Sequence, residues 1–218
     1  MARSNDLSLQ KIGLETRISY SQFCFEPNTN ESGKKQYQGT FLIPKTADKS
    51  MLDKMVLETL VEEFGARMGG EAGIIDAIKN GVIKSPFLDG DGKQGRDKDG
   101  KPKEGYAGHW FIRGTSGEDY PPKMLISQRG AIVPGGKADI KSGDYGYPVV
   151  NVYTWDNPKN GKGASFGFSM FLKSRDGESI GGGAGVPSNP DEYFEAIPDE
   201  GAAPSETKTG AGAAGLFG

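Results

Sequence analysis

The first half of the chain contains two stretches in which apolar and polar residues alternate, a pattern typical of strands that are buried on one face. They span residues 14–25 and 35–44. One face carries Leu14, Thr16, Ile18 and Tyr20 in the first stretch, and Tyr37, Phe41 and Ile43 in the second. Residues 28–33 between them are polar and suit a turn, so we expect an antiparallel hairpin.

Between about residues 46 and 81 the spacing of apolar residues changes to that of helices. Asp48 or Thr46 can cap the start of a first helix. Its apolar stripe consists of Met51, Leu52, Met55, Leu60 and Phe64 and ends before Gly65. A second, shorter helix over residues 74–80 is expected to stop at Gly81, because glycine suits the left-handed position that follows a helix.

Alternation returns in three later stretches, residues 108–114, 147–155 and 164–173. In the first stretch one face carries Trp110 and Ile112, and the other carries His109, Phe111 and Arg113. In the second stretch one face carries Val150 and Val152, and the other carries Tyr147, Val149, Asn151, Tyr153 and Trp155. In the third stretch one face carries Phe166, Phe168, Met170 and Leu172, and the other carries Ser165, Gly167, Ser169, Phe171 and Lys173. We expect Trp110, Phe166 and Phe168 to pack in the core.

Five strands, one helical insertion and many turns favour a small, mainly β barrel. Glycine contributes 34 of 218 residues, more than twice the average share of about 7%. A mostly helical protein is disfavoured, since each glycine in a helix interior costs about 1 kcal/mol. We predict an OB-fold-like antiparallel β-barrel over residues 1–186, with a helical insertion at about residues 46–81.

Residues 89–104 contain no apolar side chain that could hold them in a core, so we expect an exposed flexible loop. Its Asp89 and Asp91 would suit calcium. An EF-hand loop, however, needs a further oxygen ligand and a closing glutamate at positions where this chain has Lys93 and Gly100. A solvated loop is therefore preferred over a metal site, and its basic residues could equally contact a polyanion.

Charge divides the chain near residue 187. The formal net charge is −3, which by itself disfavours a polyanionic ligand. Residues 187–218 hold six acidic residues and one lysine, a net charge of −5, which leaves +2 for residues 1–186. The C-terminal segment has too few apolar residues to offset its chain entropy, so we expect a disordered acidic tail. A net positive body is compatible with nucleic acid.

One cysteine and one histidine limit the chemistry of the chain. Cys24 cannot form an intramolecular disulfide, and residues 1–11 lack the apolar core of a signal peptide, so we expect an intracellular protein. No zinc site of histidine and cysteine ligands can be assembled, and no nucleophile motif accompanies His109. We therefore predict no cofactor, no metal, no membrane association and no enzymatic activity.

Aromatic residues interleaved with basic ones form the pattern with the clearest chemical meaning. Single-stranded nucleic acid is held by stacking of bases on aromatic rings, about 1–3 kcal/mol per base, in a basic groove that follows the phosphates. The candidate contact residues are Arg17, Lys34, Lys35, His109, Phe111, Arg113, Lys123, Tyr147, Tyr153, Trp155, Lys173 and Arg175. The alternative, that the rings fill the barrel core, stays open even for Tyr147, Tyr153 and Trp155, whose strand is already aliphatic on its other face.

Several short motifs follow one another along the chain in a distinctive order. They are Arg17 to Tyr20, Phe25-Glu26-Pro27, Leu42-Ile43-Pro44-Lys45, Gly108 to Arg113, Ser142 to Gly146 before Val149 to Tyr153, and Asn160 to Gly163 followed by Lys173 to Gly182. Over about residues 12–183 this order resembles the family of single-stranded DNA-binding proteins encoded in tailed-bacteriophage replication modules. The resemblance implies an OB-fold that binds single-stranded DNA without sequence preference. It also implies protection of that DNA during phage replication, recombination and repair, in the cytoplasm of the bacterial host.

The acidic tail suggests a regulatory hypothesis. At low salt the tail would occupy the basic groove and compete with DNA, and incoming phosphates would free it to recruit a phage or host polymerase, helicase or recombinase. The tail residues assigned to partner binding are Asp191, Glu192, Glu195, Asp199, Glu200 and Phe217. The alternative is a tail that only adds solubility.

A function of another class also stays open at this point. A phage structural or assembly protein could have the same β-barrel and no nucleic-acid role. Titration with single-stranded DNA separates the two hypotheses, because only a DNA-binding protein would respond. The sequence leaves the oligomeric state open, a homodimer included.

Overall fold

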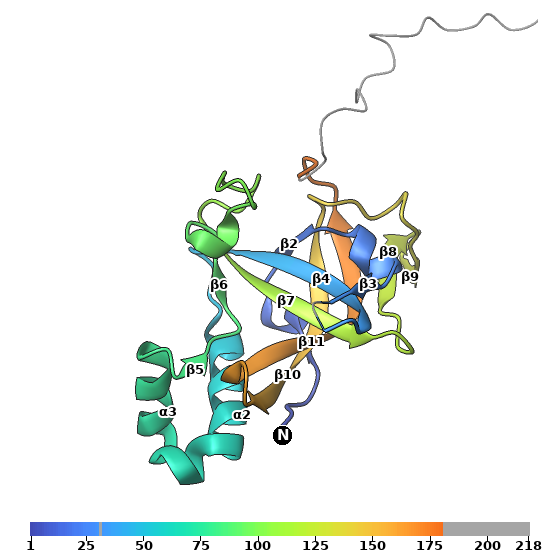
Figure 1. Ribbon diagram of the computed structural model, residues 1–218. Coiled ribbons are helices and arrows are strands. Elements are labelled where there is room, and N and C mark those ends of the chain that lie inside the picture. The colour runs from blue at the N-terminus through green and yellow to red at the C-terminus, as the bar shows by residue number, and fades with distance from the viewer. Residues whose placement is uncertain (31, 181–218) are drawn as a thin grey trace, which may run out of the picture. The chain divides into compact units, whose positions relative to one another are not determined.

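A computed structural model describes residues 1–30 and 32–180 (Figure 1). The described residues form a mainly β structure with a few helices. In chain order its elements are β1 (Leu7–Ser8), the 3-10 helix η1 (Leu9–Ile12), β2 (Thr16–Ser19), α1 (Gln22–Phe25), β3 (Asn28–Thr29), β4 (Lys35–Pro44), α2 (Ser50–Met68), α3 (Gly70–Lys79), β5 (Ile83–Lys84), β6 (Leu88–Asp89), the 3-10 helix η2 (Lys93–Gly95), β7 (His109–Gly117), β8 (Lys123–Gln128), β9 (Ala131–Pro134), β10 (Tyr145–Asn157) and β11 (Gly161–Arg175).

The strands predicted from alternation close into a ring, in the order β2, β4, β7, β11, β10 and back to β2. β2 and β4 pair antiparallel as expected, with Ile18 opposite Phe41. β4 with β7, β10 with β11, and β10 with β2 are also antiparallel. The ring is antiparallel, as predicted, except at one pairing, where β11 runs parallel to β7 with Gly167 beside Thr115.

The first predicted strand, residues 14–25, is shorter than expected. β2 ends at Ser19 because Tyr20 adopts a positive φ of 54°, which turns the chain into the short helix α1. This helix buries Cys24, whose thiol donates to the carbonyl of Gln38. Burial raises the pKa of the Cys24 thiol to about 12, so it stays protonated and unreactive at neutral pH.

The alternation predicted for β11 holds only as far as Phe168. A register shift relative to β10 pairs Val150 with Phe168 but Val149 with Met170, so that one residue of β11 has no partner. This bulge exchanges the two faces of the strand. As a result Phe171 is fully buried, whereas Met170, which alternation assigns to the core face, is only half-buried.

The helical insertion forms with longer helices than expected. The capping position of α2 is Lys49 rather than Asp48 or Thr46, but the backbone N–H of Ser50 donates to the Asp48 carboxylate at 2.9 Å, so Asp48 still satisfies a free donor at the start of the helix. α2 continues past Gly65 and ends at Gly69, where φ is +81°. The end expected for the second helix is confirmed, since Gly81 follows α3 with a φ of +70°. In Figure 1, α2 and α3 lie side by side as a helical hairpin.

Aromatic rings fill the barrel interior. Phe41 contacts Phe168 edge to face at a centroid distance of 5.0 Å and stacks on Phe171 at 5.8 Å. Gly39 and Gly114, opposite each other on β4 and β7, leave the space that these rings use. A Cβ atom would lie 2.4 Å from the Phe41 ring at Gly39 and 2.6 Å from Phe168 Cβ at Gly114. These glycines serve packing rather than turns.

The segment 89–104, predicted as a flexible loop, is tied to the barrel. The Lys45 ammonium lies 2.6 Å from Asp89 and 2.8 Å from Asp91, and hydrogen bonding to Lys45 lowers the pKa of both carboxyls. Within the loop, the Lys103 N–H donates to the carbonyl of Gly95 at 2.8 Å. The two carboxylates considered for calcium therefore neutralise a lysine.

The chain divides into two units, Met1–Gly182 and Gly183–Gly218. The expected domain boundary after residue 186 and the acidic tail lie outside the described residues. In the described part of the chain, no helix has both the length and the apolar character needed to span a membrane.

Replacing Phe41 by alanine tests the role of the aromatic core. We expect the free energy of unfolding to fall by about 3–5 kcal/mol, because the ring is fully buried and its loss leaves a cavity. Urea denaturation measures this change. Ile132→Ala is the control, with an expected effect of about 0.5 kcal/mol or less, because this side chain is 63% exposed. A loss below about 1 kcal/mol for Phe41→Ala would contradict the assignment.

Candidate nucleic-acid interface

Four strands of the barrel present one continuous row of side chains away from the aromatic core. Gln38 of β4 pairs with Thr115 of β7, Thr115 with Gly167 of β11, and Gly167 with Asn151 of β10. We call the surface around this row the outer face, formed by Gln36, Gln38, Arg113, Thr115, Asn151, Tyr153, Trp155, Gly163, Ser165 and Gly167. It is polar, and its small residues lie beside two aromatic rings.

Tyr153 and Trp155 lie on the outer face as alternation predicts, and both are half-buried. The Tyr153 hydroxyl lies 3.2 Å from the Thr115 hydroxyl, and the Trp155 indole N–H donates to Ser165 at 3.1 Å. The indole ring rests on the backbone of Gly163, where a Cβ would lie 2.5 Å from Cζ2 of Trp155. These contacts fix the orientation of both rings while part of each remains accessible to solvent.

A groove of about 640 Å³ runs along the outer face beside Tyr153. It is lined by Met1, Ala2, Arg3, Asp6, Lys34, Gln36, Thr115, Ser116, Gly117, Tyr120, Asn151, Tyr153, Gly167, Phe168 and Ser169. The exposed cations Arg3 and Lys34 lie on its wall. Arg3 donates to the Asn151 side chain at 3.2 Å, and Asn151 donates in turn to Asp6 at 2.7 Å. Sequence reasoning found Lys34 but missed Arg3 and Tyr120, whose surrounding residues do not alternate.

A pair of cations borders the outer face on the side of β7. Arg113 is exposed, and Lys103 lies close enough for the Arg113 charge to act on it. Burial, followed by the like charge of Arg113, lowers the pKa of Lys103 below its usual range. The two cations lie over buried rings, Lys103 at 5.4 Å from the Tyr106 centroid and Arg113 at 5.6 Å from that of Phe111. An anion between them would relieve their repulsion.

Phe111 cannot stack on a base in this structure, contrary to the prediction. It is fully buried in a second apolar cluster with Leu42, Tyr106 and Ile180. Its ring meets that of Tyr106 at a centroid distance of 5.0 Å. β7 does turn this side chain away from the aromatic core, but Tyr106, which precedes β7, and Ile180, which follows β11, cover it. We therefore leave Phe111 out of the interface.

Three predicted phosphate contacts lie at the far end of β10 and β11, where their side chains are already engaged with carboxylates or backbone carbonyls. Arg175 binds Glu15 at 2.8 Å and lies 3.5 Å from the Tyr145 ring centroid. Lys173 binds Asp144 at 2.8 Å, and although burial alone would lower its pKa, hydrogen bonds to carboxylates raise it. The Arg17 guanidinium donates to the carbonyls of Gly143 and Glu178. These cations hold loops together, and we leave them out of the interface.

The other predicted DNA contacts lie at several separate places on the structure. Tyr147 and Lys123 extend the outer face, since they pair with Leu172 and Met170 of β11 respectively. Lys35 lies 3.4 Å from Glu118 on an exposed surface. The His109 imidazole Nδ1 lies 2.7 Å from the carbonyl of Ala107, away from the groove. The predicted tail contacts, Asp191 to Glu200 and Phe217, lie outside the described residues.

Comparison with known proteins gives one matching family and a shared fold. The family model described as Enterobacter phage Enc34, ssDNA-binding protein, matches residues 10–202. Putative protein p50 of Acyrthosiphon pisum secondary endosymbiont phage 1 is 29% identical over 170 residues, which cover 77% of this chain and 84% of the relative. The solved structure of the single-stranded DNA-binding protein from bacteriophage Enc34 matches with a TM-score of 0.52 at 18% identity, covering 84% of this chain and 88% of that one. Its C-terminal truncation matches with a TM-score of 0.51 at 20% identity, over 76% and 85%.

Replacing Arg113 by glutamine tests the proximity of the two cations. We expect the pKa of Lys103 to rise toward its usual value, because the like charge is removed while part of the burial remains. NMR titration of the lysine ε-methylene signals measures the change. Arg129→Gln, in the turn between β8 and β9, removes the same charge elsewhere and should leave Lys103 unchanged. An unaltered Lys103 in the Arg113 variant would show that the two charges do not interact.

Proposed function

The chain belongs to the family of the Enterobacter phage Enc34 ssDNA-binding protein, and on this premise we propose that it binds single-stranded DNA without sequence preference. The single observation that supports this most is the placement of Tyr153 and Trp155 on a polar outer face beside a groove with exposed cations. Aromatic platforms in a basic groove are what non-specific binding of single strands requires. We take the closed barrel to be an OB-fold, which binds oligonucleotides on its strand face.

The proposed binding mode assigns each group a task. Tyr153 and Trp155 are two residues apart on β10, about 7 Å along the strand, so each ring can stack on its own base. Lys34 and Arg3 pair with phosphates in the groove, and the Lys103 and Arg113 pair takes a phosphate at its border. Gly163 and Gly167 leave room for the Trp155 ring and the Asn151 side chain to lie against the sheet, which keeps the Trp155 ring in place for stacking. No contact to a base edge is needed, so all sequences bind.

We infer the biological setting from the same family membership. The protein would coat and protect single-stranded DNA during phage replication, recombination and repair, in the cytoplasm of the bacterial host, as a binding protein rather than an enzyme. The family match favours this function over that of a structural or assembly protein. Polymerase, helicase or recombinase partners and a homodimer remain part of the proposal.

The acidic tail completes the proposed function. Residues 187–218 carry a net charge of −5 and residues 1–186 a charge of +2, so the tail is attracted to the same cations as DNA. It would compete with DNA at low salt, and bound DNA would leave it free to recruit replication proteins. Salt screens this competition, because it depends on attraction between opposite charges and the groove cations Arg3 and Lys34 are exposed to solvent.

The two tryptophans allow the binding site to be located by fluorescence. In a Trp110→Phe variant, single-stranded DNA should quench the remaining Trp155, because stacking brings a base onto its ring. A Trp155→Phe variant should show no quenching, because Trp110 lies away from the outer face. We expect Trp155→Ala to weaken binding about tenfold and Trp110→Phe to leave it unchanged, with affinity falling as salt rises. Quenching carried by Trp110, or no response to DNA, would contradict the proposed site.

Deleting residues 187–218 tests the competition. At low salt we expect the truncated protein to bind single-stranded DNA several-fold more tightly, and the advantage should vanish as salt approaches about 1 M. A full-length variant with its six tail acids changed to the corresponding amides is the matched control, and it should bind like the truncated protein. Fluorescence titration at several salt concentrations provides the measurement. Equal affinities of the full-length and truncated proteins for DNA at low salt would contradict the competition and would leave the tail with a role in solubility only.

A further inference from the structure

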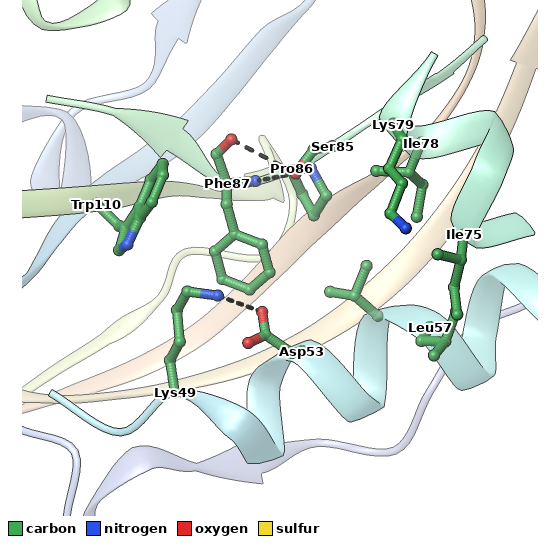
Figure 2. Close-up of a pocket in the computed structure, with 11 residues that line it drawn as sticks. Lys49, Asp53, Leu57, Ile75, Ile78, Lys79, Ser85, Pro86, Phe87 and Trp110 are labelled. Carbon is green, nitrogen blue, oxygen red and sulfur yellow. Dashed lines mark hydrogen bonds and ion pairs between the residues drawn. The ribbon is translucent and has the colours of Figure 1, made fainter. Parts of the chain in front are cut away.

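A second cavity, of about 510 Å³, lies among α2, α3 and residues 85–87 (Figure 2). Its walls are mostly aliphatic and aromatic, formed by Val56, Leu57, Ile75, Ile78, Phe87 and Trp110. Val56 is buried, whereas the other side chains are only half-buried, so apolar surface remains open to a ligand. The cavity shares no lining residue with the groove on the outer face. The helical insertion thus carries a site that DNA stacking does not use.

The mouth of this cavity is positively charged. Figure 2 shows Lys49 paired with Asp53 on α2, and Lys79 reaching toward the opening from α3. The Lys49 ammonium also lies 4.4 Å from the ring centroid of Phe87, so it borders the apolar wall directly. Asp53 neutralises one of the two lysines, which leaves the exposed Lys79 charge to attract an anionic group.

The composition of the walls discriminates between two kinds of ligand. A nucleobase has donors and acceptors around its edge, and burying them against Leu57, Ile75 and Ile78 would leave them without partners. The Ser85 hydroxyl is already engaged with the N–H of Phe87 at 3.1 Å. A leucine or phenylalanine side chain, in contrast, has no polar groups to leave unpaired, and its burial in the cavity is favourable because it removes apolar surface from water. The walls therefore favour an apolar side chain.

We propose that the cavity is a docking site for a partner protein, specifically for an acidic peptide segment that inserts a leucine or phenylalanine side chain. The apolar walls take the side chain, and the exposed Lys79 ammonium group at the mouth faces the flanking carboxylates. This combination of an apolar anchor and charge complementarity is a common basis of peptide recognition. The proposal does not rest on DNA binding, since the two sites have separate residues.

The test uses the full chain and a fluorescein-labelled probe peptide, Asp-Glu-Asp-Leu-Phe-Asp-Glu, with Ser-Ser in place of Leu-Phe as the control peptide. We expect saturable binding of the probe alone by fluorescence polarisation. In the Trp155→Phe background the probe should also change the emission of Trp110, which lines the cavity. Ile78→Glu should weaken binding at least tenfold by placing a carboxylate in the wall, and Lys79→Glu about threefold.

Two controls separate docking from misfolding and from DNA binding. Ile132→Glu, on the exposed edge of β9, should bind the probe normally. Lys79→Glu changes an exposed side chain, so its thermal unfolding should match that of the parent chain, and both cavity variants should keep their affinity for single-stranded DNA. Absence of probe binding, equal binding of the control peptide, or binding unchanged by both cavity variants would overturn the proposal. So would loss of DNA affinity in these variants, or probe binding that emerges only after residues 187–218 are removed.

Discussion

The packing of Phe41 with Phe168 and Phe171 is the contact on which the rest of the molecule depends. These three rings come from β4 and β11, and the helices α2 and α3 lie between these two strands along the chain. The rings meet only because Gly39 and Gly114 leave room for them. Once Phe168 points inward, the neighbouring Gly167 must point outward, because side chains alternate along a strand. The room that Gly167 leaves for the Asn151 side chain on the outer face is therefore a consequence of how the interior is filled.

Charge in this protein is divided between holding the fold and leaving cations for a ligand. Lys173, Arg175 and Lys45 each lie against carboxylates, and each fixes a loop or strand end. Lys34 and Arg113 are exposed beside polar or aromatic surface instead. A basic residue in the sequence thus says little about phosphate binding until its acidic neighbours are known, and those neighbours come from distant parts of the chain.

The sequence predicted what depends on local periodicity. The barrel strands and the helical insertion follow from alternation or helical spacing, and they are confirmed. Alternation also places Tyr153 and Trp155 on one face of their strand, and the structure decides the open question by placing that face away from the aromatic core. Prediction from the sequence failed where tertiary packing overrides the alternation of apolar and polar residues. The bulge in β11 places Phe171 in the core, and a second apolar cluster buries Phe111. Arg175 forms an ion pair with Glu15, which lies 160 residues earlier in the chain. The high glycine content predicts many turns, yet Gly39 and Gly114 are positions beside the aromatic core.

The parallel seam between β7 and β11 has a consequence for how the protein is made. β11 is the final strand of the described chain, and it alone joins β7 to β10 and closes the ring. A nascent chain still lacking this strand has neither Gly167, which pairs with Thr115 of β7, nor the Ser165 hydroxyl that fixes Trp155. Pairings of such long sequence separation form late and slowly. The complete outer face therefore exists only after residue 175 has left the ribosome.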